Sequence, residues 1–215
     1  DWCNWLFVRI TTDDGLTGHG FTSITEEDVI AQIVNGVVGP AILGDDPLNH
    51  ERIWDKLYWT LMPRGQTGYA AHALAAIDIA LWDIKGKHYQ APVWDLLGGK
   101  VRDKVRLHLL LKGGNPDEIR HHAKIAAEEG FTALKFDPLQ AGYQDQTLAR
   151  LIEGARDMAA AAREGVGLDV DLIFELHRKL SPMFGVAVAD ALAEFRPLFI
   201  EDPIQIDSIM LQGEL

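Results

Sequence analysis

Two glutamates in the second half of the sequence stand where they could hold a divalent cation. Glu175 ends the apolar run 172–174, and Glu201 ends the run 198–200, 26 residues further on. That separation fits one strand–helix unit, so we expect both carboxylates at the ends of neighbouring parallel strands, about 4.8 Å apart. Without a cation two such carboxylates would repel each other, and oxygen ligands suit Mg²⁺. We therefore predict Glu175 and Glu201 as metal ligands and Mg²⁺ as the cofactor.

Three residues near the ends of the same apolar runs carry side chains for proton transfer or charge pairing. Strand alternation predicts that His177 lies on the same side as Glu175, and that Lys135 lies on the same side as Asp137. Each also has a plain structural interpretation: a solvated strand end for the glutamate, a surface ion pair for Lys135 and Asp137, and a core imidazole for His177. The spacing of the two glutamates, with His177 beside one of them, favours the functional interpretation, in which His177 moves a proton.

These residues belong to a predicted alternation of strands and helices. Strands are expected at 105–111, 132–137, 171–177 and 197–202, and helices at 116–129, 146–163 and 182–195. Such alternation is typical of a parallel sheet, either half of a barrel or an open doubly wound sheet. No G-x-G-x-x-G turn follows the first strand, which disfavours a dinucleotide-binding sheet. We therefore predict an α/β fold in which residues 101–215 form a partial (β/α) TIM-type barrel of about four βα units, truncated after the fourth.

The first hundred residues follow a different pattern. Asp13-Asp14-Gly15 is a turn signal between the β-rich runs 7–10 and 16–18, which predicts a hairpin. Apolar residues then recur at helical spacing over 25–38, 49–61 and 69–87. Residues 1–100 are therefore expected to form an α+β domain, whose N-terminus we expect to be incomplete.

Composition limits the classes of partner. The chain has 215 residues, 47% of them hydrophobic, and a formal net charge of −12 with scattered lysines and arginines. This balance disfavours binding to nucleic acid or to an anionic membrane. The single cysteine, Cys3, excludes an internal disulfide framework, and no signal peptide or membrane span is evident, so a cytoplasmic protein is expected.

Several motifs, in order along the chain, resemble those of one family, the mandelate racemase and muconate lactonizing branch of the enolase superfamily. They lie at residues 7–18, 76–87, 96–99, 133–138, 175–177 and 200–203. The resemblance implies an α+β capping domain over a (β/α) barrel. It is strongest to the sugar-acid dehydratases of that branch.

The resemblance also implies roles for individual residues. Glu175 and Glu201 would be the first two of three Mg²⁺ ligands, and Lys135 would help to hold the substrate carboxylate. His177 would be the acid that protonates the departing hydroxyl. Racemases and cycloisomerases of the branch often carry a second lysine, a base, where this sequence has Asp137. A base from a later strand is therefore expected, with Tyr143 a weaker candidate.

The function implied is dehydration of an aldonic or related sugar acid. A proton would be abstracted next to the carboxylate, giving an enediolate stabilised by Mg²⁺, and the β-hydroxyl would then leave. Asp137 and, from the capping domain, His19 and Arg64 are candidate substrate-binding residues, although His19 and Arg64 could equally be surface loop residues. The expected partners are a small carboxylate substrate and other copies of the protein in a homo-oligomer. Two alternatives stay open: a cycloisomerase, epimerase or racemase of the same superfamily, and a truncated, non-catalytic homologue that acts as an oligomerisation or binding module.

Overall fold

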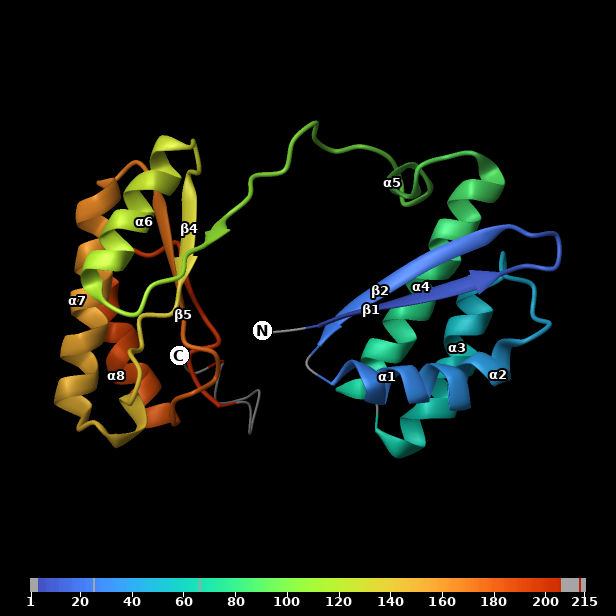
Figure 1. Ribbon diagram of the computed structural model, residues 1–215, viewed down its shortest axis with the longest axis horizontal. Coiled ribbons are helices and arrows are strands. Elements are labelled where there is room, and N and C mark those ends of the chain that lie inside the picture. Colours follow the sequence, from blue (N-terminus) through green and yellow to red (C-terminus); the bar gives the residue numbers. More distant parts are fainter. Residues whose placement is uncertain (1–3, 25, 66, 206–212, 214–215) are drawn as a thin grey trace. The chain divides into compact units, whose positions relative to one another are not determined.

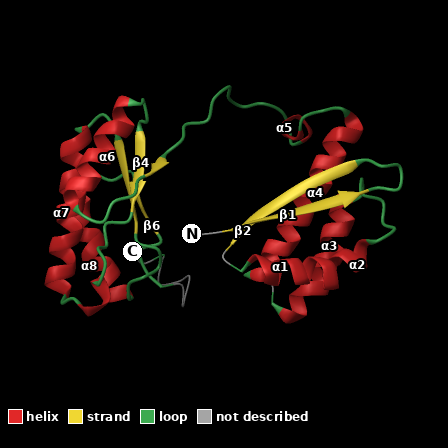
Figure 2. Cartoon of the chain, in the orientation of Figure 1, coloured by secondary structure: helices red, strands yellow, loops and turns green. Residues whose placement is uncertain are grey.

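The computed structural model describes residues 4–24, 26–65, 67–205 and 213 (Figure 1). The chain divides into two compact units, Asp1–Asp103 and Lys104–Leu215. The first contains a two-stranded antiparallel sheet and the second a four-stranded parallel sheet, each packed with helices (Figure 2). The prediction of a mixed α/β chain is therefore confirmed.

The first unit begins with the predicted hairpin, β1 (Asn4–Thr11) and β2 (Thr17–Ile24). The turn is closed by two backbone hydrogen bonds, from Thr12 N–H to the Leu16 carbonyl (2.9 Å) and from Gly15 N–H to the Thr12 carbonyl (3.0 Å). Gly15 has a φ of 86°, a left-handed conformation that glycine adopts without steric cost.

Helices follow the hairpin in the first unit. In chain order they are α1 (Glu27–Ile33), the π-helical turn η1 (Val34–Val38), α2 (Gly39–Ile42), α3 (His50–Leu61), the 3₁₀ turn η2 (Met62–Arg64), α4 (Tyr69–Tyr89) and α5 (Val93–Leu96). The single helix predicted over 25–38 thus widens into a π turn just before Pro40. Pro40 lacks an N–H and would crowd the carbonyl four residues earlier, which disfavours a regular α turn. The predicted first residue of that helix, Thr25, lies outside the described residues.

The hairpin packs against α4 through two glycines of β2. A Cβ at Gly18 would lie 2.2 Å from the Ala80 carbonyl oxygen, and one at Gly20 would lie 1.8 Å from the Ala76 carbonyl oxygen. Only glycine allows so close an approach of two backbones. The residue between them, His19, therefore projects from the opposite, exposed face of β2.

The second unit is a parallel sheet with strands in sequential order. They are β3 (Leu109–Leu110), β4 (Ala133–Phe136), β5 (Asp171–Glu175) and β6 (Phe199–Glu201). Between them lie α6 (Pro116–Glu128), the 3₁₀ turn η3 (Tyr143–Asp145), α7 (Leu148–Val166), α8 (Pro182–Leu192) and the 3₁₀ turn η4 (Ala193–Phe195). The three long helices α6, α7 and α8 lie on one side of the sheet (Figure 1), and their buried faces form one apolar core with β4 and β5.

The first helix of this unit has a defined amino-terminal cap. The Asn115 side chain accepts a hydrogen bond from Glu118 N–H (3.0 Å), and the Glu118 carboxylate accepts one from Gly114 N–H (2.8 Å). Pro116 takes the first helical position, where its missing N–H costs nothing.

The predicted strand at 105–111 is wrong in its length, since β3 has only two residues. Its pairing with β4 begins at Leu109 and Leu134. Before that point the Thr132 carbonyl faces β5, where it accepts a hydrogen bond from Asp171 N–H (2.9 Å), and the Arg106 guanidinium reaches the same carbonyl with its side chain (2.6 Å).

At the opposite end of the sheet from the strand ends that carry the predicted site, one arginine joins several segments. Arg163, on α7, donates to the carbonyls of Gly167 (2.7 Å) and Val170 (2.8 Å), just before β5. It also donates to the carbonyls of Phe195 (2.8 Å) and Arg196 (3.3 Å), shortly before β6. Four backbone acceptors are thus satisfied by one side chain.

Candidate active site

Glu175 and Glu201 lie next to each other at the carboxyl ends of β5 and β6. They are direct register partners in the parallel ladder, as their 26-residue spacing predicts. The ladder continues one step further, because Leu176 N–H donates to the Glu201 carbonyl (3.0 Å). Among the residues that the structure describes, Glu175 is one of the few charged ones that are buried, so its charge requires a partner.

Lys135, from β4, supplies positive charge between the two glutamates. Its Nζ lies 2.8 Å from Glu175 Oε2 and 3.1 Å from Glu201 Oε2. Burial disfavours the charged form of the lysine, but the hydrogen bonds to both glutamates outweigh it and raise the pKa of Lys135. The two carboxylates therefore converge on one positive charge, the Lys135 ammonium. Carboxylates that bind a divalent cation must converge in the same way.

These carboxylates could supply part of the coordination shell of a metal ion. Mg²⁺ is bound through carboxylate oxygens and commonly keeps several waters, so two protein ligands are compatible with it. Within the described ranges, no three His, Cys, Asp or Glu side chains gather in a way that could hold a metal. The pair thus fits Mg²⁺ as a partial ligand set.

His177 lies beside the glutamates, but strand alternation is not what puts it there. β5 ends at Glu175, and both His177 (φ 52°) and Arg178 (φ 58°) have left-handed backbones. The prediction of a strand through residue 177 is therefore wrong: the chain turns, and this turn brings His177 Nε2 to 3.4 Å from Glu175 Oε1.

The turn after β5 concentrates backbone strain at the site. A left-handed conformation costs a residue with a side chain roughly 1–2 kcal/mol. Asp202, just after β6, is also left-handed (φ 47°), and its carbonyl accepts a hydrogen bond from Arg178 N–H (2.8 Å). Strained residues at the ends of two adjacent strands are typical of functional sites.

Asp137 links the ends of β4 and β5. Its Oδ1 accepts a hydrogen bond from Leu139 N–H (2.9 Å), and its Oδ2 lies 3.4 Å from His177 Nδ1. The same Oδ2 forms a close ion pair with the Lys179 ammonium. The structure therefore brings together Lys135, Asp137, Glu175, His177 and Glu201.

Lys179 is a member of this group that the sequence did not reveal. Its Nζ contacts Asp137 and lies 5.5 Å from the centroid of the Tyr143 ring, within cation–π range. Four residues beyond Glu175, it would be far from the site on a straight strand. The only signal was the run of basic residues His177-Arg178-Lys179 shortly after the apolar run 172–174.

The remaining predicted site residues belong to the first unit. His19 is exposed on β2, where its backbone N–H donates to Asp83 Oδ2 (2.8 Å) and its Nδ1 lies 3.7 Å from the same oxygen. The backbone of Arg64 ends η2, and its side chain lies outside what the structure describes. Their roles in substrate binding stay predictions.

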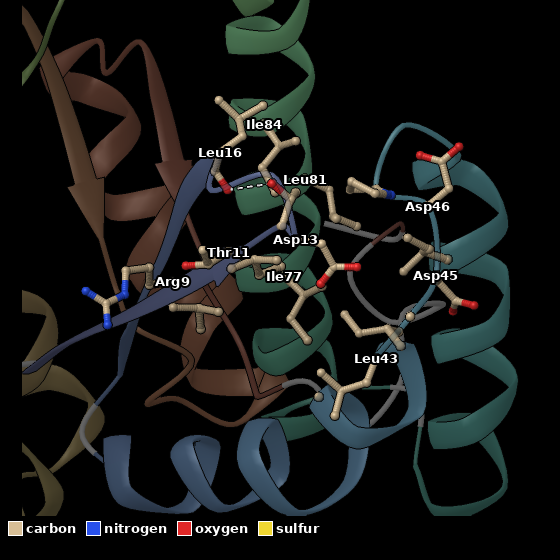
Figure 3. A pocket seen from close by; sticks show the side chains of 18 of the residues that line it. Arg9, Thr11, Asp13, Leu16, Leu43, Asp45, Asp46, Ile77, Leu81 and Ile84 are labelled. Atoms are coloured by element: carbon tan, nitrogen blue, oxygen red, sulfur yellow. Dashed lines mark hydrogen bonds between the residues drawn. The ribbon is translucent and has the colours of Figure 1, made fainter.

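A pocket of about 760 Å³ lies within the first unit (Figure 3). Ile77, Leu81 and Ile84 of α4 contribute apolar side chains to it, and Asp13 and Asp45 are among its acidic lining residues. No predicted site residue that the structure describes lines this pocket. It therefore does not coincide with the cluster at the carboxyl ends of β4, β5 and β6.

No helix in the described part of the chain is both long enough and apolar enough to cross a lipid bilayer.

Comparison with known proteins identifies the family. Residues 3–98 match the mandelate racemase/muconate lactonizing enzyme N-terminal domain, and residues 118–212 match the enolase C-terminal domain-like family. The D-galactonate dehydratase of Klebsiella pneumoniae is 33% identical over 201 residues, which are 93% of this chain and 52% of that protein. The chain thus spans about half the length of the curated relatives it matches.

Solved structures agree. A member of the enolase superfamily from Salmonella Typhimurium superposes with a TM-score of 0.90 at 28% identity, over 98% of this chain and 60% of that one. A racemase from Streptomyces coelicolor with bound magnesium superposes with a TM-score of 0.83 at 28% identity, over 96% of this chain and 56% of that one. The chain therefore belongs to the mandelate racemase/muconate lactonizing enzyme branch of the enolase superfamily.

Proposed function

We propose that this chain is part of a Mg²⁺-dependent dehydratase that acts on an aldonic or related sugar acid. The observation that carries the proposal is the convergence of Glu175 and Glu201 on the Lys135 ammonium, with His177 beside Glu175. The similarity to a D-galactonate dehydratase supports the reaction class, and the magnesium in the similar racemase supports the cofactor.

In this proposal the second unit is the first part of a (β/α) barrel and the first unit is its capping domain. Four parallel strands in sequential order, with helices on one side, suit such a barrel. The third metal ligand and the general base would come from outside the described residues. The substrate is a small carboxylate, and the whole protein would be a homo-oligomer.

Each clustered residue has a task. Glu175 and Glu201 would hold the cation, and Lys135 would place its ammonium against the substrate carboxylate. Bound Mg²⁺ would supply positive charge that stabilises the negative charge developing on that carboxylate. After the base removes the α-proton, the β carbon–oxygen bond breaks and the hydroxyl leaves as water with a proton from His177. The resulting enol becomes a 2-keto-3-deoxy acid.

A racemase, epimerase or cycloisomerase of the same branch is the alternative in chemistry, and one similar structure is described as a racemase. A two-base racemase would need a lysine base at the position of Asp137. Here that position holds a carboxylate, which contacts Lys179 and His177, and this argues against the alternative. A non-catalytic homologue is the alternative of another class. The retained group of Lys135, Glu175, His177 and Glu201 argues against it.

The test is turnover by the full-length protein. We expect a panel of aldonic and aldaric acids with Mg²⁺ to yield a 2-keto acid, detected as its semicarbazone, from at least one member. Glu201→Gln should abolish Mg²⁺-dependent turnover and leave the fold intact, because it removes one charged ligand and keeps the side-chain volume. Glu194→Gln is the matched control, since Glu194 is an exposed partner of Arg156 on the helical side.

His177→Asn separates the two proton tasks. We expect it to block dehydration and to spare exchange of the substrate α-proton with solvent, measured by NMR in deuterated water. A His177→Asn protein that still dehydrates at the wild-type rate would refute the acid role, and a Glu201→Gln protein with unchanged activity would refute the metal assignment.

A further inference from the structure

We propose that Asp137 and Lys179 are positioning residues that hold the His177 ring with Nε2 directed at the departing hydroxyl. This inference rests on the proposed function and adds to it two residues and a division of tasks between the imidazole nitrogens. Nδ1 faces Asp137, and Nε2 faces Glu175 on the side of the proposed metal.

The Asp137 carboxylate is itself fixed at both oxygens. Oδ1 accepts the Leu139 N–H at 2.9 Å, which anchors the carboxylate to the backbone after β4. Oδ2 contacts the Lys179 ammonium and lies 3.4 Å from His177 Nδ1. All three side chains are largely shielded, with exposed fractions of 24% for Asp137, 29% for Lys179 and 15% for His177. Shielded charge pairs hold their geometry better than solvated ones.

Lys179 is held from three directions. Its ammonium contacts Asp137 and lies over the Tyr143 ring, which in turn packs against the apolar core. Its backbone N–H donates to the Leu176 carbonyl (3.1 Å), which closes the turn that contains His177. One residue therefore contacts the positioning carboxylate with its side chain and fixes the turn with its backbone.

The imidazole ring of His177 needs support from neighbouring side chains. His177 and Arg178 both have left-handed backbones, so the turn is strained and its own conformational preference does not hold the imidazole. With Asp137 at one nitrogen and Glu175 at the other, the ring has contacts at both edges. Removing Lys179 would free Asp137 Oδ2 to rotate, and the contact at Nδ1 would loosen.

A positioning role predicts unequal effects on the two proton tasks. Partners that orient a functional side chain through one intermediate contact are commonly worth about 10–100-fold in activity. We expect Lys179→Met to lower kcat for dehydration by about 10–100-fold. KM and the rate of α-proton exchange should change by less than about threefold, because neither depends on His177 Nε2. Lys179→Arg keeps the ion pair and the stacking on Tyr143, and should restore most of kcat.

The experiment uses the full-length protein with Mg²⁺ and D-galactonate, and then the panel acid that gives the highest turnover. The Mg²⁺ affinity of Lys179→Met, measured by calorimetry, should match that of the wild type. Lys124→Met is the control, because Lys124 is an exposed partner of Glu128 on α6. Parallel losses of exchange and dehydration in Lys179→Met, or no loss of either, would overturn the inference.

A second readout does not depend on turnover. In protein with ¹⁵N-labelled histidine, the His177 ring signals are assigned by their loss in His177→Asn. We expect them to shift in Lys179→Met and in Asp137→Asn, and not in Lys124→Met. If no acid of the panel is turned over while these signals shift as expected, the proposed function fails and the positioning contact stands. Unchanged ring signals in both variants would overturn the positioning contact itself.

Discussion

Replacing Gly20 by alanine should separate the hairpin from α4 and strongly destabilise the first unit. The added Cβ would lie 1.8 Å from the Ala76 carbonyl oxygen and 2.8 Å from Ala80 N, whereas ordinary contact begins at 3.4 Å. Both obstacles are backbone atoms of a long helix and cannot rotate away. The hairpin would have to retreat by about 1.6 Å, and a gap of about 0.5–1 Å already forfeits a quarter to a half of a dispersion contact.

The loss extends to the core beneath the hairpin, where Val8 of β1 packs with Ile77 and Leu81 of α4. Overpacking commonly costs about 1–3 kcal/mol, and an obstacle made of backbone puts Gly20→Ala at the top of that range, about 3 kcal/mol. All six tryptophans lie before residue 100, so tryptophan fluorescence during urea unfolding reports on the first unit.

Gly36→Ala is the matched control for this measurement. Gly36 lies in η1, a Cβ there would have no atom within 4 Å, and its φ is not left-handed. We expect this control to be neutral or to gain about 0.5–1 kcal/mol, because alanine loses less backbone freedom on folding than glycine. A Gly20→Ala protein within about 1 kcal/mol of the wild type would refute the reasoning from close packing.

Two further predictions concern helix ends. Gln90 follows α4 in a left-handed conformation (φ 53°, ψ 37°). Gln90→Gly should therefore raise the free energy of unfolding by about 1 kcal/mol, whereas Gln90→Ala should not. The tryptophan fluorescence assay described above measures both. Two hydrogen bonds lower the pKa of Glu118: the larger effect comes from Gly114 N–H, and the smaller one from the Asn115 side chain. Its contribution to stability is therefore present above the unfolded-state pKa and is lost as pH falls through the lower folded-state value. Glu118→Gln should be less stable than the wild type near pH 7, and the difference in stability should vanish in acid. Circular dichroism at 222 nm during urea unfolding measures this difference. A difference that persists below both the folded-state and the unfolded-state pKa would contradict the explanation.

Much of the second unit could be predicted because the residues that indicate each strand or helix lie within that element. The apolar runs that became β4 and β5 are buried, whereas the run of β6 is partly exposed, and the positions of all three follow directly from the residues. The adjacency of Glu175 and Glu201 also followed, because a 26-residue separation leaves room for one helix and little else.

Other features depend on contacts that a sequence does not display. Val105 and Leu107 have the residue types of a strand, yet both are exposed, because a strand also needs a neighbour to hydrogen-bond with. The turn at His177 could not be predicted, since a left-handed histidine is held by its surroundings and not by its own preference. Lys179 was missed for the same reason.

The four carbonyl contacts of Arg163 have a consequence for the cluster at the other end of the sheet. They join the segments that lead into β5 and β6 at the end of the sheet away from Glu175 and Glu201. The strained turns at the other end therefore do not have to hold the strands in register. An exchange of His177 or Arg178 would therefore leave in place the anchorage that keeps the two proposed metal-binding carboxylates side by side.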